Sequence, residues 1–278
     1  MSQDLMIGET EYELFQKDNV VATLRAMEKA NYSPLFMPEF AQLRIAHPSL
    51  FKDWGRTMSI RASGKTSAGS AVEIYAHIPG DWSQRQYISD AISEGKLIAH
   101  ALPLTQESFD ALEKRNGEMQ DGARLVTVMD HAQAQKGLFG EQNLDEALEN
   151  PHVRDFFGGE KQAQTYLKAH QNVHGNKIYV WHSNDLDNVP VARPLVLNSY
   201  VLVSLSDFNG NRRVPGVRRR ASVSEPGAHA MRDEAKNIYA NSYVTLLANP
   251  KEALAALDDK TALGIEKIIS DYKREAKQ

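Results

Sequence analysis

An antiparallel hairpin near residue 65 decides between the fold classes open to this chain. Apolar and polar residues alternate over 58–62 and again over 72–78, and a glycine-containing loop, 64–69, joins the two runs. Such alternation is typical of strands with one buried and one polar face. Other strand patterns, at 124–130 and 194–208, stand among helical segments without a regular strand–helix–strand repeat. The sequence therefore favours an α+β fold, a mostly antiparallel sheet built from hairpins with several flanking helices.

Helical patterns occur near both ends of the chain. The sequence Thr-Glu-Tyr-Glu from Thr10 has the form of a capping box and predicts a helix from there to about Ala30. After about Gly227 only helical spacing is visible. We therefore expect an α+β domain over 1–225 and a C-terminal helical segment over 226–278 that packs on the same domain.

Composition excludes several classes of protein. The chain of 278 residues contains no cysteine, which rules out a disulfide framework, cysteine-ligated zinc, an iron–sulfur cluster and a thiol nucleophile. The most apolar window, 194–205, falls short of the ~20 residues that a membrane helix needs. The first residues lack the basic and apolar regions of a secretory signal. We expect a soluble, intracellular, cytoplasmic protein that does not contact membranes, with its oligomeric state left open.

Positive charge is concentrated in one segment of a chain whose formal charge is −4. Residues 190–232 contain seven arginines, no lysine and two acidic residues. Five of these arginines fall within nine residues and form the Arg cluster: Arg212, Arg213, Arg218, Arg219 and Arg220. Arginine binds phosphate and carboxylate through two parallel hydrogen bonds, which lysine does not do. Because Asn209-Gly210 favours a tight turn, we expect an Arg-rich hairpin over 202–220 that binds an anionic partner, nucleic acid or another phosphate-bearing ligand.

Two structural explanations of the Arg cluster stay open beside this hypothesis. Arginines can protect an edge strand from aggregation, and Pro215 would confine its strand to a sheet edge or a bulge. Alternatively, the arginines pair within the chain with acidic stretches such as 141–160.

A second functional hypothesis is a hydrolase or transferase that acts on a phosphate-bearing small molecule. His182 stands near the end of a predicted strand, 177–183, and Asp185 and Asp187 follow that strand in what reads as a loop. One imidazole and two carboxylates can hold a divalent metal or divide acid and base roles, although the same residues also suit a polar turn. The sequence identifies no metal or cofactor and leaves open whether the chain is an enzyme. A third hypothesis is a protein-interaction module that uses the C-terminal helices.

Two further groups of polar residues have a spacing that chemistry can use. His170 and His174 lie at i and i+4 on a predicted helix, which suits either metal binding or a helix terminus. On the hairpin, the residues of the non-core face either cover a solvated surface or line a cleft. These residues are Arg61, Glu73, Tyr75 and His77.

Overall fold

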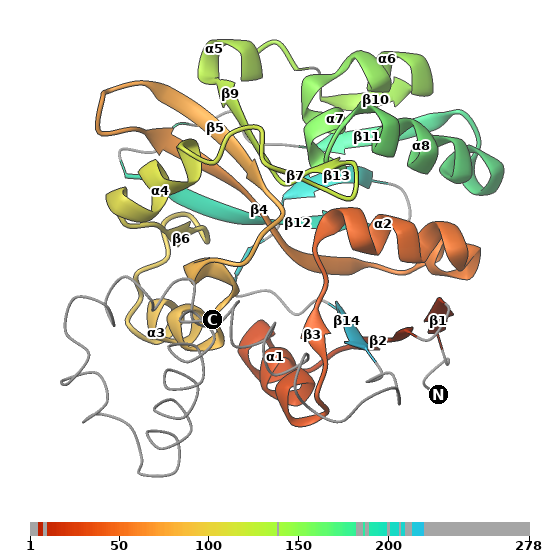
Figure 1. Ribbon diagram of the computed structural model, residues 1–278, viewed down its shortest axis with the longest axis horizontal. Coiled ribbons are helices and arrows are strands. Elements are labelled where there is room, and N and C mark those ends of the chain that lie inside the picture. The colour runs from red at the N-terminus through yellow and green to blue at the C-terminus, as the bar shows by residue number, and fades with distance from the viewer. Residues whose placement is uncertain are drawn as a thin grey trace, which may run out of the picture. The chain divides into compact units, whose positions relative to one another are not determined.

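The computed structural model describes residues 5–7, 10–137, 139–181, 186, 189–198, 201–205, 207–208 and 213–219. All of them belong to one compact unit, 1–220. Helices and largely antiparallel sheets are mixed along this unit, so the predicted α+β class is confirmed (Figure 1). The segment 226–278 and the turn at Asn209-Gly210 lie outside the described residues, and the boundary at residue 225 stays a prediction.

A large sheet forms the centre of the unit. Along this sheet the strands follow the order β10 (Gly140–Asn143), β11 (Lys177–Trp181), β13 (Val201–Leu205), β12 (Val191–Leu197), β4 (Gly55–Lys65), β5 (Ala71–Ala76) and β9 (Val126–Asp130). The short strand β6 (Leu102–Pro103) also pairs with β12. Within this sheet β11 and β13 run parallel, and the other described pairs are antiparallel. The predicted hairpin is present as β4 and β5, with Ala62 opposite Ile74.

A smaller sheet joins the two ends of the unit. Its order is β1 (Leu5–Ile7), β2 (Thr10–Phe15), β14 (Val214–Arg219) and β3 (Ser33–Pro34). The predicted helix from Thr10 is therefore wrong over its first part, where the chain forms β2. The helix α1 (Val20–Lys29) begins later, and the Asn19 side chain accepts a hydrogen bond from the Ala22 amide at its start. Pairing of β2 with β14 outweighs the local capping signal, because Glu11 stands opposite Arg218 in this ladder.

The predicted Arg-rich hairpin over 202–220 is not formed by the described strands. β13 pairs with β11 and β12, whereas β14 pairs with β2 and β3. β14 also lies between two strands rather than at an edge, contrary to the expectation from Pro215. Pro215 is accommodated there because β3 pairs only with Gly216 and Val217, and the carbonyl of Pro215 accepts a 2.9 Å hydrogen bond from the Leu35 amide.

The large sheet carries a separate core on each face. One core combines alternate residues of β4 and β5, such as Ile60 and Ile74, with α1, α3 (Arg85–Ser93) and α4 (Gln106–Glu113). The other includes Tyr75 and Met129, which come from β5 and β9. It packs against five helices, namely α2 (Met37–Ala46), α5 (His131–Ala134), α6 (Leu144–Glu149), α7 (Pro151–Phe156) and α8 (Glu160–His174).

The remaining described elements are short. They are η1 (Pro48–Lys52), η2 (Asp81–Ser83), β7 (Met119–Gln120) and β8 (Ala123–Arg124). Within the part of the chain that the structure describes, no helix combines the length and the apolar character needed to cross a bilayer.

Candidate functional site

A pocket of about 340 Å³ opens beside β9, where the large sheet ends. Its walls come from the strands β8 and β9, from α5, from α7 and from the first residues of α8. Thr127, Met129 and Asp155 are buried and line its deep part, whereas Gln133 and Glu160 are exposed at its rim. Ligand pockets in proteins span about 300–1,000 Å³, so the volume of this one lies at the lower end of that range.

Two arginines carry the positive charge of the pocket. Arg124 comes from β8 and is exposed, and Arg154 comes from α7 and is half-buried. Within the described ranges, neither guanidinium has an ion-pair or hydrogen-bond partner, although both act electrostatically on Asp155. Their donor groups therefore remain available to a ligand.

Asp155 supplies a buried carboxyl group to the same pocket. Burial raises the pKa of Asp155 to about 6, and the charges of Arg124 and Arg154 together with a hydrogen bond to Thr127 oppose this rise. The carboxyl group therefore changes charge just below neutral pH, inside a pocket that it helps to line.

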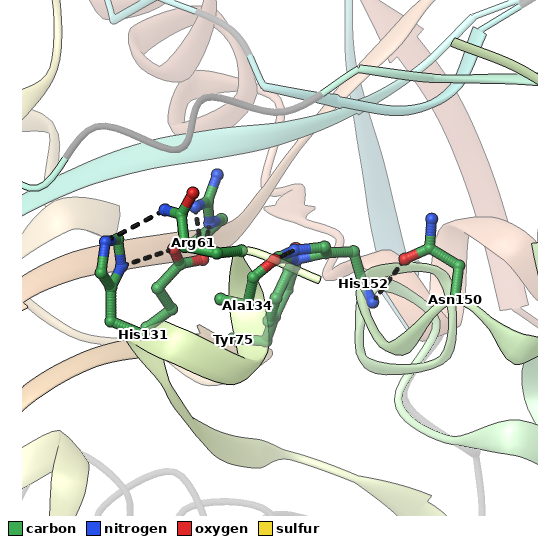
Figure 2. A network of polar contacts seen from close by, with 8 residues as sticks. Arg61, Tyr75, His131, Ala134, Asn150 and His152 are labelled. Carbon is green, nitrogen blue, oxygen red and sulfur yellow. Dashed lines mark hydrogen bonds and ion pairs between the residues drawn. The ribbon is translucent and has the colours of Figure 1, made fainter. Parts of the chain in front are cut away.

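A buried ion pair supports the pocket from the sheet below (Figure 2). Nε of Arg61 on β4 donates to the Glu73 carboxylate on β5 over 2.5 Å, and both side chains are buried. The second oxygen of Glu73 accepts from Nδ1 of His131, the first residue of α5, over 3.2 Å. Gln135 lies 3.0 Å from the other ring nitrogen of His131. Through these contacts the sheet fixes the start of α5, which carries Gln133.

A second contact from β5 joins α5 to α7. Nε2 of His152 lies 2.8 Å from the carbonyl oxygen of Ala134, which only accepts, so this nitrogen carries the proton. Nδ1 of the same ring lies 2.8 Å from the Tyr75 hydroxyl, and in the tautomer that carries its proton on Nε2 it accepts from that hydroxyl. Figure 2 shows Tyr75 and Ala134 at the ring of His152, and Asn150 on the other side of this residue. One imidazole thus ties both pocket helices to the strand beneath them.

His77, the residue that follows β5, makes the third contact. Its Nε2 donates to the backbone carbonyl of Asp155 over 2.9 Å, and its Nδ1 accepts from the Ser59 hydroxyl over 2.8 Å. Burial lowers the pKa of His77 to about 4, which keeps the ring neutral as these bonds require. Alternate residues along one segment, Glu73, Tyr75 and His77, therefore position the helices that line the pocket.

The structure decides between the two alternatives for the polar face of the hairpin. Its residues do not cover a solvated surface, because Arg61, Glu73, Tyr75 and His77 are all buried beneath α5 and α7. Among them, none belongs to the residues that line the pocket directly.

The described members of the Arg cluster are engaged within the chain. Arg213 pairs with Asp53 and also donates to Gln16. Arg218 donates to the two carboxylate oxygens of Glu11 over 2.8 and 2.9 Å. Its guanidinium also lies 4.9 Å from the centre of the Tyr32 ring. These partners are not the acidic stretch 141–160 that the sequence suggested.

Other predicted site residues lie outside the described part of the chain. His182, Asp185 and Asp187 belong to this group, as do Arg212, Arg220 and the side chain of Arg219. Their predicted roles stay untested.

The two histidines of α8 pack against each other, with His170 buried and His174 half-buried. His170 is 2% exposed, and its ring packs against Phe51 and His174. Burial lowers the pKa of His170 to about 4, and the charges of His174 and Arg44 act in the same direction. Over the described ranges, no group of three or more His, Asp or Glu side chains is arranged to hold a metal ion.

Sequence reasoning missed the residues of the pocket because they come from separate segments. Arg124, Gln133, Arg154 and Glu160 share no short motif, and only the folding of four elements brings them together. The only indication of this region in the sequence was the polar face of the hairpin. Its side chains hold α5 and α7, two of the elements that line the pocket.

Comparison with known proteins gives a structural match. No protein-family model and no curated protein matches the chain. A solved structure is similar to it with a TM-score of 0.66 and 29% sequence identity, covering 77% of this chain and all of the other. That structure illustrates the "accommodation of massive sequence variation in Nanoarchaeota by the C-type lectin fold". The fold of the present chain is thus similar to the C-type lectin fold.

This similarity overturns the functional hypotheses drawn from the Arg cluster. The prediction of a nucleic-acid partner is wrong, because the solved structure that the chain resembles has a C-type lectin fold and gives no support to nucleic-acid binding. The described arginines of the cluster also form ion pairs inside the chain, with Asp53 and Glu11. Part of the positive charge concentrated in 190–232 is therefore used in ion pairs within the unit.

Proposed function

We propose that the chain is a recognition module that binds a saccharide unit in the pocket between β9, α5, α7 and α8. The supporting observation is the pocket itself, in which hydrogen-bonding side chains from separate elements converge on one small space. The similarity to a C-type lectin fold agrees with this class of ligand, since that fold serves carbohydrate and protein binding.

The lining of the pocket suits a polyhydroxyl ligand. Arg124 and Arg154 only donate hydrogen bonds, Asp155 and Glu160 accept them when ionised, and the Gln133 amide does both. Sugar hydroxyls donate and accept at neighbouring positions, so they match such a mixed set. Met129 adds an apolar surface in the deep part of the pocket.

The supporting contacts favour a site that is arranged before the ligand arrives. α5 and α7 are held by Glu73, Tyr75 and His77, three buried side chains on one segment of the sheet. A site whose walls are fixed in advance loses less free energy on ordering when it binds.

A glycan array probed with the full chain tests this function. We expect binding to at least one class of saccharide. The variant Gln133→Trp places a large ring at the rim of the pocket and should weaken that binding at least tenfold. Lys136→Trp, a change at an exposed position on the neighbouring turn, should leave it unchanged. Absence of binding to any saccharide, or equal binding by Gln133→Trp, would contradict the proposal.

A further inference from the structure

We infer that the saccharide unit in this pocket carries a carboxylate group, which Arg124 and Arg154 hold. The inference rests on the proposed function and specifies the chemistry of its ligand.

The two guanidinium groups provide the first argument. They come from different elements, β8 and α7, and line the same pocket. Neither has an ion-pair partner among the described side chains, in contrast to Arg213 and Arg218 of the Arg cluster. A guanidinium group presents a planar set of donors that matches a carboxylate with two parallel hydrogen bonds. A neutral sugar has no ionised group with which a guanidinium group can form such a bidentate pair.

The acceptor groups of the pocket provide the second argument. Asp155 and Glu160 need donors from the ligand, and a simple anion such as acetate, phosphate or sulfate brings few or none. A sugar acid offers both kinds of group on one small ring, a carboxylate for the arginines and hydroxyl donors for the acidic side chains. The mixed lining therefore favours a sugar acid over a plain anion.

The surroundings of Asp155 make this binding depend on pH. Arg124 of β8, Arg154 of α7 and Glu160 of α8 line the pocket with it, and Thr127 of β9 is bonded to its carboxyl group. Beneath the pocket, Tyr75 of β5 lies within electrostatic range of Asp155, and His77, which follows β5, contacts the backbone carbonyl of Asp155. The pKa of Asp155 is about 6, so this carboxyl group takes up a proton between pH 7.5 and 5.5. The pocket then loses one negative charge, and its affinity for a carboxylate rises.

Isothermal titration calorimetry of the full chain at pH 7.5 and 5.5 tests the inference. The acidic probes are glucuronate, galacturonate and N-acetylneuraminate, and the neutral probes are glucose, galactose and N-acetylglucosamine. We expect at least one acid to bind ten times more tightly than the neutral sugars, with a further gain of at least threefold at pH 5.5. Circular dichroism at both pH values establishes that the chain remains folded.

Variants of the two arginines assign the effect to the pocket. Arg154→Gln, and separately the exposed Arg124→Gln, should each weaken binding of the acid at least tenfold. Arg25→Gln, a change at an exposed position of α1, should not alter it. If one arginine variant fails to fold, the other still decides the question.

Each other outcome overturns a defined part of the account. Neutral sugars that bind as tightly as the acids would refute the carboxylate while leaving the proposed function intact. Acetate or N-acetyl-aspartate amide that binds as tightly as the sugar acids would refute selection of a saccharide acid. If no saccharide of either kind binds, the proposed function and this inference both fail.

Discussion

The Tyr75 hydroxyl donates a 2.8 Å hydrogen bond to Nδ1 of His152, although the two residues lie 77 positions apart in the sequence. The same ring donates through Nε2 to the carbonyl of Ala134, so a single imidazole connects β5, α5 and α7. Both side chains are fully buried. These bonds connect β5 to α5 and α7, two helices that line the pocket. Their contribution to the stability of the fold can be measured by substitution.

Removal of the Tyr75 hydroxyl should destabilise the fold. Tyr75→Phe leaves Nδ1 of His152 buried without a donor, which costs about 1–3 kcal/mol of unfolding free energy. Urea denaturation measures this loss. The control Tyr179→Phe removes a hydroxyl from a tyrosine that is 38% exposed and should change the stability by less than about 0.5 kcal/mol. Equal effects of the two changes would argue against the role given to the bond.

Loss of the Glu73 charge should be more costly. Glu73→Gln leaves the buried Arg61 guanidinium without its counter-charge, and breaking a buried ion pair from one side costs about 3–5 kcal/mol. Glu118→Gln breaks an ion pair with Arg115 whose side chains are both about 40% exposed, and should cost less than about 1 kcal/mol. Thermal unfolding of the two variants side by side makes the comparison. Similar midpoints for both would contradict the burial of the Arg61–Glu73 pair.

Stability should fall as the pH is lowered from 6.5 towards 4. His77 and His170 have pKa values of about 4 in the folded chain against 6.5 ordinarily, so the unfolded chain binds more protons in this window. Asp155 acts in the opposite sense, because its pKa is raised from 3.8 to about 6 and the folded chain binds its proton first. The contributions of the two histidines exceed the opposite contribution of the aspartate. The free energy of unfolding should therefore fall by on the order of 3 kcal/mol between pH 6.5 and 4.

Urea denaturation at a series of pH values measures this dependence. The variant His170→Gln removes one of the two histidine contributions and should flatten the fall in unfolding free energy between pH 6.5 and 4. Stability that stays constant or rises on acidification in the unmodified chain would show that these histidines are not held neutral.

A methyl group at Gly137 should disturb the contact between α5 and α7. A Cβ there would lie 2.2 Å from Cδ2 of His152, a separation that requires the ring to move. Gly137→Ala should therefore cost about 1–3 kcal/mol of stability and weaken ligand binding. The penalty should shrink when the change is introduced into His152→Ala, where the ring is absent, and a full penalty in that background would rule out the proposed clash.

The fold class could be predicted from the sequence, because it depends on local alternation. The hairpin of β4 and β5 appeared where residues 58–62 and 72–78 alternate, but its polar face, with Glu73, Tyr75 and His77, is neither the solvated surface nor the cleft lining that the sequence suggested. Local sequence could not show that helices cover this face. That outcome depends on contacts with α5 and α7, which lie more than fifty positions further along the chain.

Local signals misled where long-range pairing decided the structure. The capping-box sequence at Thr10 became β2, because this segment pairs with β14 and Glu11 meets Arg218 across the ladder. The pairing of β2 with β14 also explains the position of Arg218, one member of the Arg cluster. In the sequence, the charge pattern of this cluster resembled a binding surface. The pocket residues Arg124, Arg154 and Asp155 carried no signal at all, since only tertiary folding brings them together.

The most direct test of the central claim is to locate the bound saccharide on the chain by chemical-shift mapping. Backbone amide spectra recorded during titration with an acidic saccharide should show shifts concentrated in 124–133 and 151–160, the two segments that line the pocket. The amides of β1 and β2 should stay unchanged. Shifts that fall elsewhere, or spectra that do not change at saturating saccharide, would contradict the assignment of this pocket as the recognition site.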